Sequence, residues 1–151
     1  MTAVAALEHE LHAALPYLSV RARVVLDALL LSGGSIGSAT QVAARLGLPS
    51  RFALGRLLRR QGLPGLRELA TWISLLGWMI RAERYKLPLF VIATRSRRSP
   101  AVCYRSVKRL TGLTWVQLQA RGSPWALRLF MARCRAAASR PRATLRHQRS
   151  V

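Results

Sequence analysis

The side chains with the clearest binding chemistry are arginines and lysines that recur in two short stretches about fifty residues apart. The first runs from Leu54 to Leu63 and reads LGRLLRRQGL, and the second runs from Cys103 to Leu113 and reads CYRSVKRLTGL. In both, apolar residues recur at steps of three and four, basic residues lie mainly between them, and a glycine follows. Such helices present cationic groups that bind phosphates and guanine edges. Two copies indicate one duplicated DNA-reading unit.

The net charge of the chain points to a polyanionic partner. Its 151 residues contain 25 Lys and Arg against 5 Asp and Glu, which gives a net charge of +20 and a pI near 12.0. Residues 1–83 contain 9 basic and 5 acidic residues, whereas residues 84–151 contain 16 basic residues and no acidic one. We therefore expect a nucleic-acid partner and a more electropositive C-terminal half.

The residue types disfavour enzymes, metal sites and membrane proteins. One Asp and four Glu form no local pattern with His or Cys, so we expect no catalytic group, metal or cofactor. Cys103 and Cys134 indicate neither a zinc site nor a disulfide framework, and Cys103 is either a redox sensor or a small core residue. The histidines, including His12, are scattered, and we expect them to be exposed. Without a signal peptide or membrane span, we expect a cytoplasmic protein at the bacterial nucleoid.

The elements that position the first basic stretch are short helices with capping residues. Residues 1–16 predict an N-terminal docking helix, and residues 17–65 predict the first helix-turn-helix unit. Within that unit, Ser19, Ser38 and Ser50 are predicted N-caps, and Gly33-Gly34 is predicted to be a turn, not a phosphate loop.

The second basic stretch follows a long apolar helix pattern. Residues 66–86 predict a connector helix, and residues 87–122 predict a second helix-turn-helix unit whose reading helix starts at Ser99-Pro100. Residues 123–151 predict a basic helix followed by a disordered tail. Four tryptophans are expected to pack in the core or, alternatively, to stack on single-stranded nucleic acid; they are Trp72, Trp78, Trp115 and Trp125. The predicted fold class is all-α.

Residues 17–122 resemble the DNA-binding domain of the AraC family, in which a long helix joins two helix-turn-helix units. The resemblance lies in Val42-Ala43-x-x-x-Gly47-Leu48, in Arg56 to Arg60, and in Tyr104 to Leu113, which is similar to the closing signature of the family. Ser96-Arg97 stands where the family has Gly-Phe. The resemblance implies a protein that consists of the DNA-binding domain alone. Its activity would depend on its abundance and its partners more than on a ligand.

The resemblance implies that two reading helices enter successive major grooves of one duplex, about 34–36 Å apart. A single chain would then carry both, so we expect a monomer on DNA. The candidate base-reading residues are Arg51, Gly55, Arg56, Ala101, Tyr104 and Arg105. The candidate phosphate-binding residues are Ser50, Arg59, Arg60, Arg95, Arg97, Arg98, Ser99, Lys108 and Arg109. We expect the first copy to select sequence and the second mainly to grip the backbone.

Two alternatives stay open at this point. The chain could bind nucleic acid without selecting sequence, as nucleoid-like or RNA-binding proteins do. It could instead be an interaction module that uses its helical scaffold to contact RNA polymerase.

Overall fold

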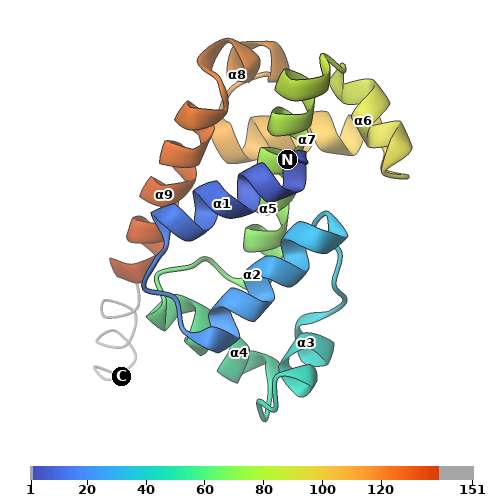
Figure 1. The fold of residues 1–151 in the computed structure, drawn as a ribbon. Helices are drawn as coiled ribbons and strands as arrows, with labels where there is room; N and C mark the ends of the chain where they lie inside the picture. The colour runs from blue at the N-terminus through green and yellow to red at the C-terminus, as the bar shows by residue number, and fades with distance from the viewer. Residues whose placement is uncertain (1, 140–151) are drawn as a thin grey trace, which may run out of the picture.

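The computed structural model describes residues 2–139, and this part of the chain consists of helices joined by short links (Figure 1). The nine helices are α1 (Ala3–Ala14), α2 (Val20–Ser32), α3 (Ala39–Arg45), α4 (Arg51–Arg60), α5 (Leu66–Tyr85), α6 (Leu89–Arg95), α7 (Pro100–Thr111), α8 (Trp115–Arg121) and α9 (Ser123–Ser139). No strand occurs among residues 2–139, and the predicted all-α fold class is confirmed. The basic tail lies in residues 140–151, which are outside the described residues.

Three helices begin at the capping serines that the sequence places there. The hydroxyls of Ser19, Ser38 and Ser50 each accept a hydrogen bond from the backbone N–H three residues further along. Ser38 also forms a capping box with Gln41. Helix α7 starts at Ser99-Pro100, as predicted, but the Ser99 side chain makes no capping hydrogen bond.

Helix α5 is the element around which the others are packed. It contacts α1, α2, α6, α7 and α9, and its 20 residues make it about 30 Å long. Figure 1 shows α3 and α4 at one end of the molecule and α6, α7 and α8 at the other. The predicted connector helix is therefore present as a helix and lies between two groups of shorter helices.

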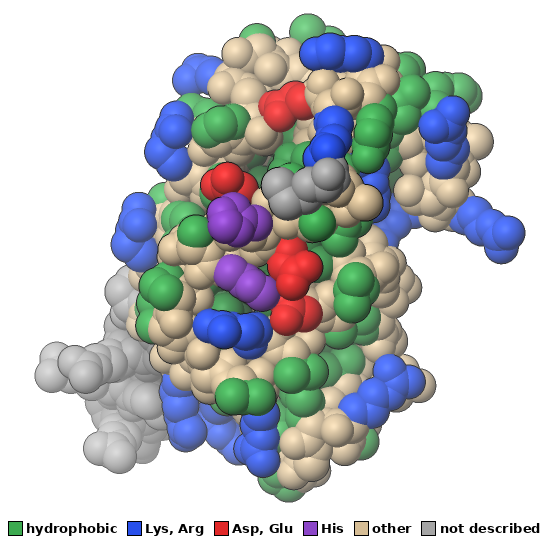
Figure 2. Space-filling view, viewed as in Figure 1, with side chains coloured by type: hydrophobic (Ala, Val, Ile, Leu, Met, Phe, Trp, Pro, Cys, Tyr) green, Lys and Arg blue, Asp and Glu red, His purple; other side chains and the backbone are tan. Residues whose placement is uncertain are grey.

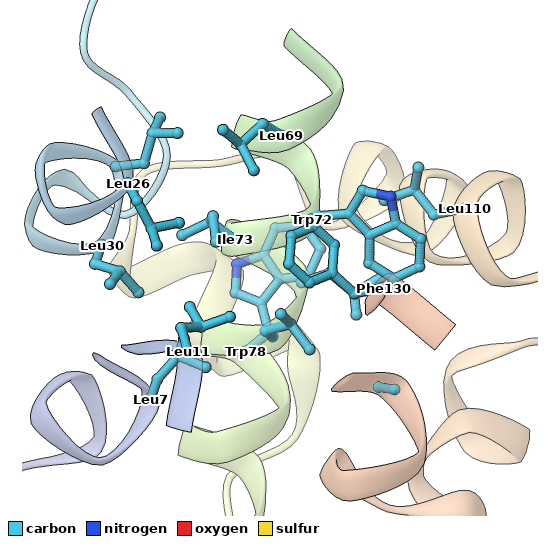
Figure 3. Close-up of a cluster of buried hydrophobic side chains, with 14 of the residues drawn as sticks. Leu7, Leu11, Leu26, Leu30, Leu69, Trp72, Ile73, Trp78, Leu110 and Phe130 are labelled. Atoms are coloured by element: carbon cyan, nitrogen blue, oxygen red, sulfur yellow. The ribbon is translucent and has the colours of Figure 1, made fainter. Parts of the chain in front are cut away.

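The core around α5 is continuous and rich in leucine and tryptophan. Trp72 is fully buried, and its ring centroid lies 5.6 Å from that of Phe130 on α9 (Figure 3). Trp78 and Trp115 are also buried, which confirms the core prediction for three of the four tryptophans. Trp125 is half-buried, with the Arg121 guanidinium 5.2 Å from its ring centroid.

The two ends of the chain extend this core. Helix α1 packs on α5 and α2, as expected of a docking helix, and α9 packs on α8, α5 and α4. The start of α9 is tied to α5 by Glu83, whose carboxylate accepts from both the N–H and the hydroxyl of Ser123, each over 2.7 Å. Glu83 therefore satisfies a donor at the N-terminus of α9 that would otherwise lack a partner.

The turns after α3 and α6 share one hydrogen-bond pattern. In the first, the N–H of Leu48 donates to the carbonyl of Ala43 over 2.9 Å, and in the second, the N–H of Arg98 donates to the carbonyl of Ala93 over 2.9 Å. The two donors are 50 residues apart, and so are the two acceptors. Helices α3 and α6 each contain 7 residues. The duplication expected from sequence therefore extends to the backbone of the turns.

The residue before the donor has a left-handed backbone conformation in each turn. Gly47 has a φ of 71°, and Arg97 has a φ of 56°. Arg97, not Ser96, is thus the structural counterpart of the turn glycine. A residue with a side chain costs about 1 kcal/mol or more in this conformation, so the second turn holds Arg97 in place against a local preference.

The carbonyl of Gly33, at the end of α2, joins three parts of the chain. It accepts a hydrogen bond from Ser74 Oγ of α5 over 2.9 Å and from Arg98 Nη2 of the α6–α7 turn over 2.6 Å. The next residue, Gly34, has a φ of 94°, and a Cβ there would lie 2.9 Å from the carbonyl oxygen of Ala70 on α5. The link after α2 therefore lies directly against α5 and is bonded to the second turn.

Candidate nucleic-acid interface

Helix α4 has one buried side and one basic side. Leu54 and Leu58 are buried to 1% and 0% exposure and fix the orientation of the helix. The candidate residues on the other side that are exposed are Arg51, Arg56, Arg59 and Arg60. Gly55 is half-buried, and the Ser50 hydroxyl is engaged in capping the helix through the N–H of Ala53.

Helix α7 is divided in the same way. Cys103, Val107 and Leu110 are buried, and the candidate residues of the outer face are all exposed: Ala101, Tyr104, Arg105, Lys108 and Arg109. The Lys108 ammonium also donates to the carbonyl of Gly112 over 3.1 Å, so part of its hydrogen-bonding capacity is used at the end of its own helix.

The two outer faces match at three basic positions. When the sequence of α4 is aligned with that of α7 by a shift of 49 positions, Arg56 aligns with Arg105. The same shift aligns Leu58 with Val107, and both are buried. It also pairs two basic positions on each helix, Arg59 with Lys108 and Arg60 with Arg109. Each helix therefore presents one central arginine and a basic pair one turn later.

Phe52 is a member of the α4 face that the sequence analysis missed. Its ring is 63% exposed, and the Arg51 guanidinium carbon lies 4.9 Å from the ring centroid. The same 49-residue shift pairs Phe52 with Ala101, which the sequence analysis named as a base-reading candidate. Applying the repeat consistently would have identified Phe52 as well. Apolar side chains at such positions fit the methyl group of thymine.

The approach to α7 contains three arginines with different surroundings. Arg95 and Arg97, two of the candidate phosphate ligands, are exposed, and Ser99 is exposed at the start of the helix. Arg98 is half-buried, and its guanidinium binds the carbonyl of Gly33. Arg98 therefore joins the end of α2 to the α6–α7 turn.

The acidic residues lie away from both basic faces. The five acids of the chain are on α1, α2 and α5, and neither residues 39–62 nor residues 89–112 contain one. Figure 2 shows the acidic and histidine side chains gathered near the middle of one face, with Lys and Arg mainly around its edge. This separation leaves α4 and α7 without carboxylates of their own to compete with phosphate.

One group of possible metal ligands forms among the described residues, on α1 and α2. Glu8, His12 and Asp27 place a ligand atom each within 4.8 Å of one another, and His12 Nε2 lies 2.7 Å from Asp27 Oδ1. Sequence reasoning missed this group, because Asp27 comes from another helix, and His12 is half-buried and bonded where an exposed side chain was expected. Neither α1 nor α2 contributes to the basic faces.

The two cysteines lie in the core. Burial raises the pKa of the Cys103 thiol, although Arg98 lowers it in part, and burial raises the pKa of Cys134 to about 12. Both side chains are 1% exposed. The core role is therefore supported for Cys103, because a redox sensor needs an accessible thiolate.

In comparisons with known proteins, no family model, curated protein or solved structure matches the chain. Among residues 2–139, no helix has both the length and the apolar character needed to cross a bilayer.

Proposed function

We propose that the protein is a sequence-specific transcriptional regulator that binds double-stranded DNA, as its resemblance to the AraC-family DNA-binding domain implies. In this proposal α3–α4 and α6–α7 are two helix-turn-helix units, and α4 and α7 enter successive major grooves. The observation that carries the proposal is the equivalence of the basic positions on α4 and α7, which pairs Arg56 with Arg105 on two helices that each follow a turn with the same hydrogen-bond pattern.

The chemistry of these faces favours base reading over backbone binding alone. Each face has an arginine at its centre, where a guanidinium can donate to O6 and N7 of guanine. Each also has an apolar residue one turn earlier, Phe52 or Ala101, which cannot bind a phosphate but can contact thymine. The basic pair one turn later would contact the backbone and set the register.

The length of α5 is compatible with this arrangement. A helix of about 30 Å between the two units is close to the 34–36 Å that separates successive major grooves on one face of DNA. One chain would then occupy both half-sites, so a monomer suffices, and because α4 and α7 differ in sequence, the preferred site would be asymmetric. Such a protein would act at the bacterial nucleoid, alone or together with RNA polymerase.

The direct test is selection of bound duplexes from a random DNA pool, followed by competition against random duplex DNA. The proposal expects an asymmetric consensus that spans two successive major grooves, and much tighter binding to the selected site. Equal affinity for every duplex would support the general nucleic-acid alternative instead. An absence of binding at low salt would leave the alternative of a module that contacts RNA polymerase.

A matched pair of variants on α4 separates the two kinds of contact. Arg56→Ala should relax preference at one base pair, with a loss of about 1–3 kcal/mol in discrimination. Arg59→Ala, on the same exposed face one turn later, should weaken binding to all sequences alike. If both variants act uniformly on all sequences, base reading by Arg56 is wrong.

A further inference from the structure

A cleft on α5 is lined by five arginines, two of which are outside the residues already expected to bind DNA. It has a volume of about 740 Å³ and lies between the end of α2, the α6–α7 turn and α7. Five arginines line it: Arg67 and Arg81 from α5, Arg97 and Arg98 from the turn, and Arg109 from α7. Arg67 and Arg81 are not among the residues expected to bind phosphate.

The charge of the cleft is uncompensated. No Asp or Glu contributes to its lining, and of the five guanidinium groups only that of Arg98 makes a hydrogen bond within residues 2–139, to the carbonyl of Gly33. Cations that line one cleft without carboxylates give it a positive electrostatic potential, which favours the binding of anions. The cleft therefore has the electrostatic character of an anion site.

The cleft also continues onto the outer face of α7. Arg109 belongs to both surfaces, and Ser99 brings the start of α7, which lacks a side-chain cap, to the cleft wall. Backbone N–H groups at such a helix end favour phosphate groups in addition to the arginines. A polyanion could thus contact the cleft and the outer face of α7 at the same time.

The lining indicates which kind of anion fits. The cleft is open and extended, and its only aromatic ring, Trp78, is 3% exposed, so it offers no surface on which a nucleobase could stack. Free nucleotides would leave their bases without a partner there. A run of phosphodiester groups matches the lining better, since it needs only cationic and N–H donors.

We propose that this cleft binds the DNA backbone that lies between the two major grooves, with Arg67 and Arg81 of α5 as phosphate ligands. The inference rests on the proposed function, because it takes α4 and α7 as the elements that enter the grooves. It makes α5 a third DNA-contacting element, in addition to its structural role. Free polyphosphate is the other source of the same chemistry.

The test compares two double variants that each remove two positive charges. In Arg67→Gln/Arg81→Gln the charges come from the cleft, and in Arg128→Gln/Arg133→Gln they come from exposed positions on α9 outside the cleft. Affinity for the selected duplex is measured by fluorescence anisotropy over a range of salt concentrations. Circular dichroism and thermal melting establish that each variant is folded, and Arg67→Lys/Arg81→Lys should restore most of the binding.

The cleft variant should lower the slope of log K against log[salt] by about 1 per arginine, roughly 2 in all, and weaken binding about tenfold or more without changing the preferred sequence. Neutral methylphosphonates placed between the two grooves should weaken the wild type but add little to the cleft variant. Equal slopes for the cleft and α9 variants would overturn the inference and leave the proposed function standing.

Two further outcomes are distinguishable. A wild-type protein that binds no duplex refutes the proposed function, and the inference falls with it. If inorganic tripolyphosphate then binds in a manner that depends on Arg67 and Arg81, the cleft is a site for free polyphosphate and not for DNA.

Discussion

Replacement of Gly34 by alanine should destabilise the protein through one close contact. Gly34 has a φ of 94°, and an added Cβ would lie 2.1 Å from Ser74 Oγ and 2.9 Å from the carbonyl oxygen of Ala70. The Ser74 hydroxyl can rotate away, but the carbonyl belongs to the backbone of α5 and cannot. The link after α2 must then move away from α5.

The neighbouring Gly33 provides a matched control. It also has a positive φ, 68°, but a Cβ there would meet nothing within 4 Å. Gly33→Ala therefore carries only the cost of a left-handed alanine, about 1 kcal/mol. Gly34→Ala carries that cost plus the loss of the Ser74 hydrogen bonds at a buried site, which is worth about 1–3 kcal/mol. We expect about 3 kcal/mol in total.

Urea denaturation of the full-length chain would measure the free energy of unfolding of each variant. The thermal midpoint should fall by about 3 °C for Gly33→Ala and by about 9 °C for Gly34→Ala. The double variant Gly34→Ala/Ser74→Ala should be destabilised by about 1 kcal/mol less than the sum of the two single effects, because both changes remove the same Ser74 hydrogen bonds. Equal destabilisation by the two glycine variants would refute the close approach of this link to α5.

Other perturbations test the core and the helix ends. Leu58→Ala, at a fully buried position of α4, should cost about 2–5 kcal/mol in urea denaturation, whereas the exposed Arg59→Ala should cost under about 0.5 kcal/mol. Glu83→Gln should cost about 1–2 kcal/mol by weakening the charged hydrogen bonds to Ser123, measured in the same way at neutral pH. Burial raises the pKa of Cys134 in the folded protein from 9.0 to about 12. The contribution of Cys134 to the free energy of unfolding should therefore be complete below pH 9 and be lost as the pH rises from 9 towards 12. Cys134→Ala should flatten that part of the stability profile.

Local sequence signals predicted the helices well because their causes are local. Serine caps, glycine ends and apolar spacing act within a few residues, and Ser19, Ser38 and Ser50 cap the helices that they were expected to cap. The basic faces of α4 and α7 follow for the same reason, since a helix exposes the side opposite its apolar stripe. The burial of Leu54 and Cys103 shows that the stripes were identified correctly.

The contacts that were missed join residues distant in sequence. Arg98 binds the carbonyl of Gly33 across 65 positions, and no local pattern distinguishes such an arginine from a free one. His12 and Asp27 meet because α1 packs on α2. The cleft around Arg67 depends on the packing of α2, α5 and α7 together, so it has no signature in any single stretch.

The hydrogen bond from Arg98 to the carbonyl of Gly33 has a consequence for the spacing of the two half-sites in a bound duplex. It joins the end of α2 directly to the turn before α7, beside a continuous α5, so the two candidate reading helices have a fixed stride. One extra base pair between half-sites rotates the second groove by about 34–36° and moves it about 3.4 Å along the axis. Such a protein would bind weakly to sites whose two half-sites have the correct sequence but are separated by the wrong number of base pairs.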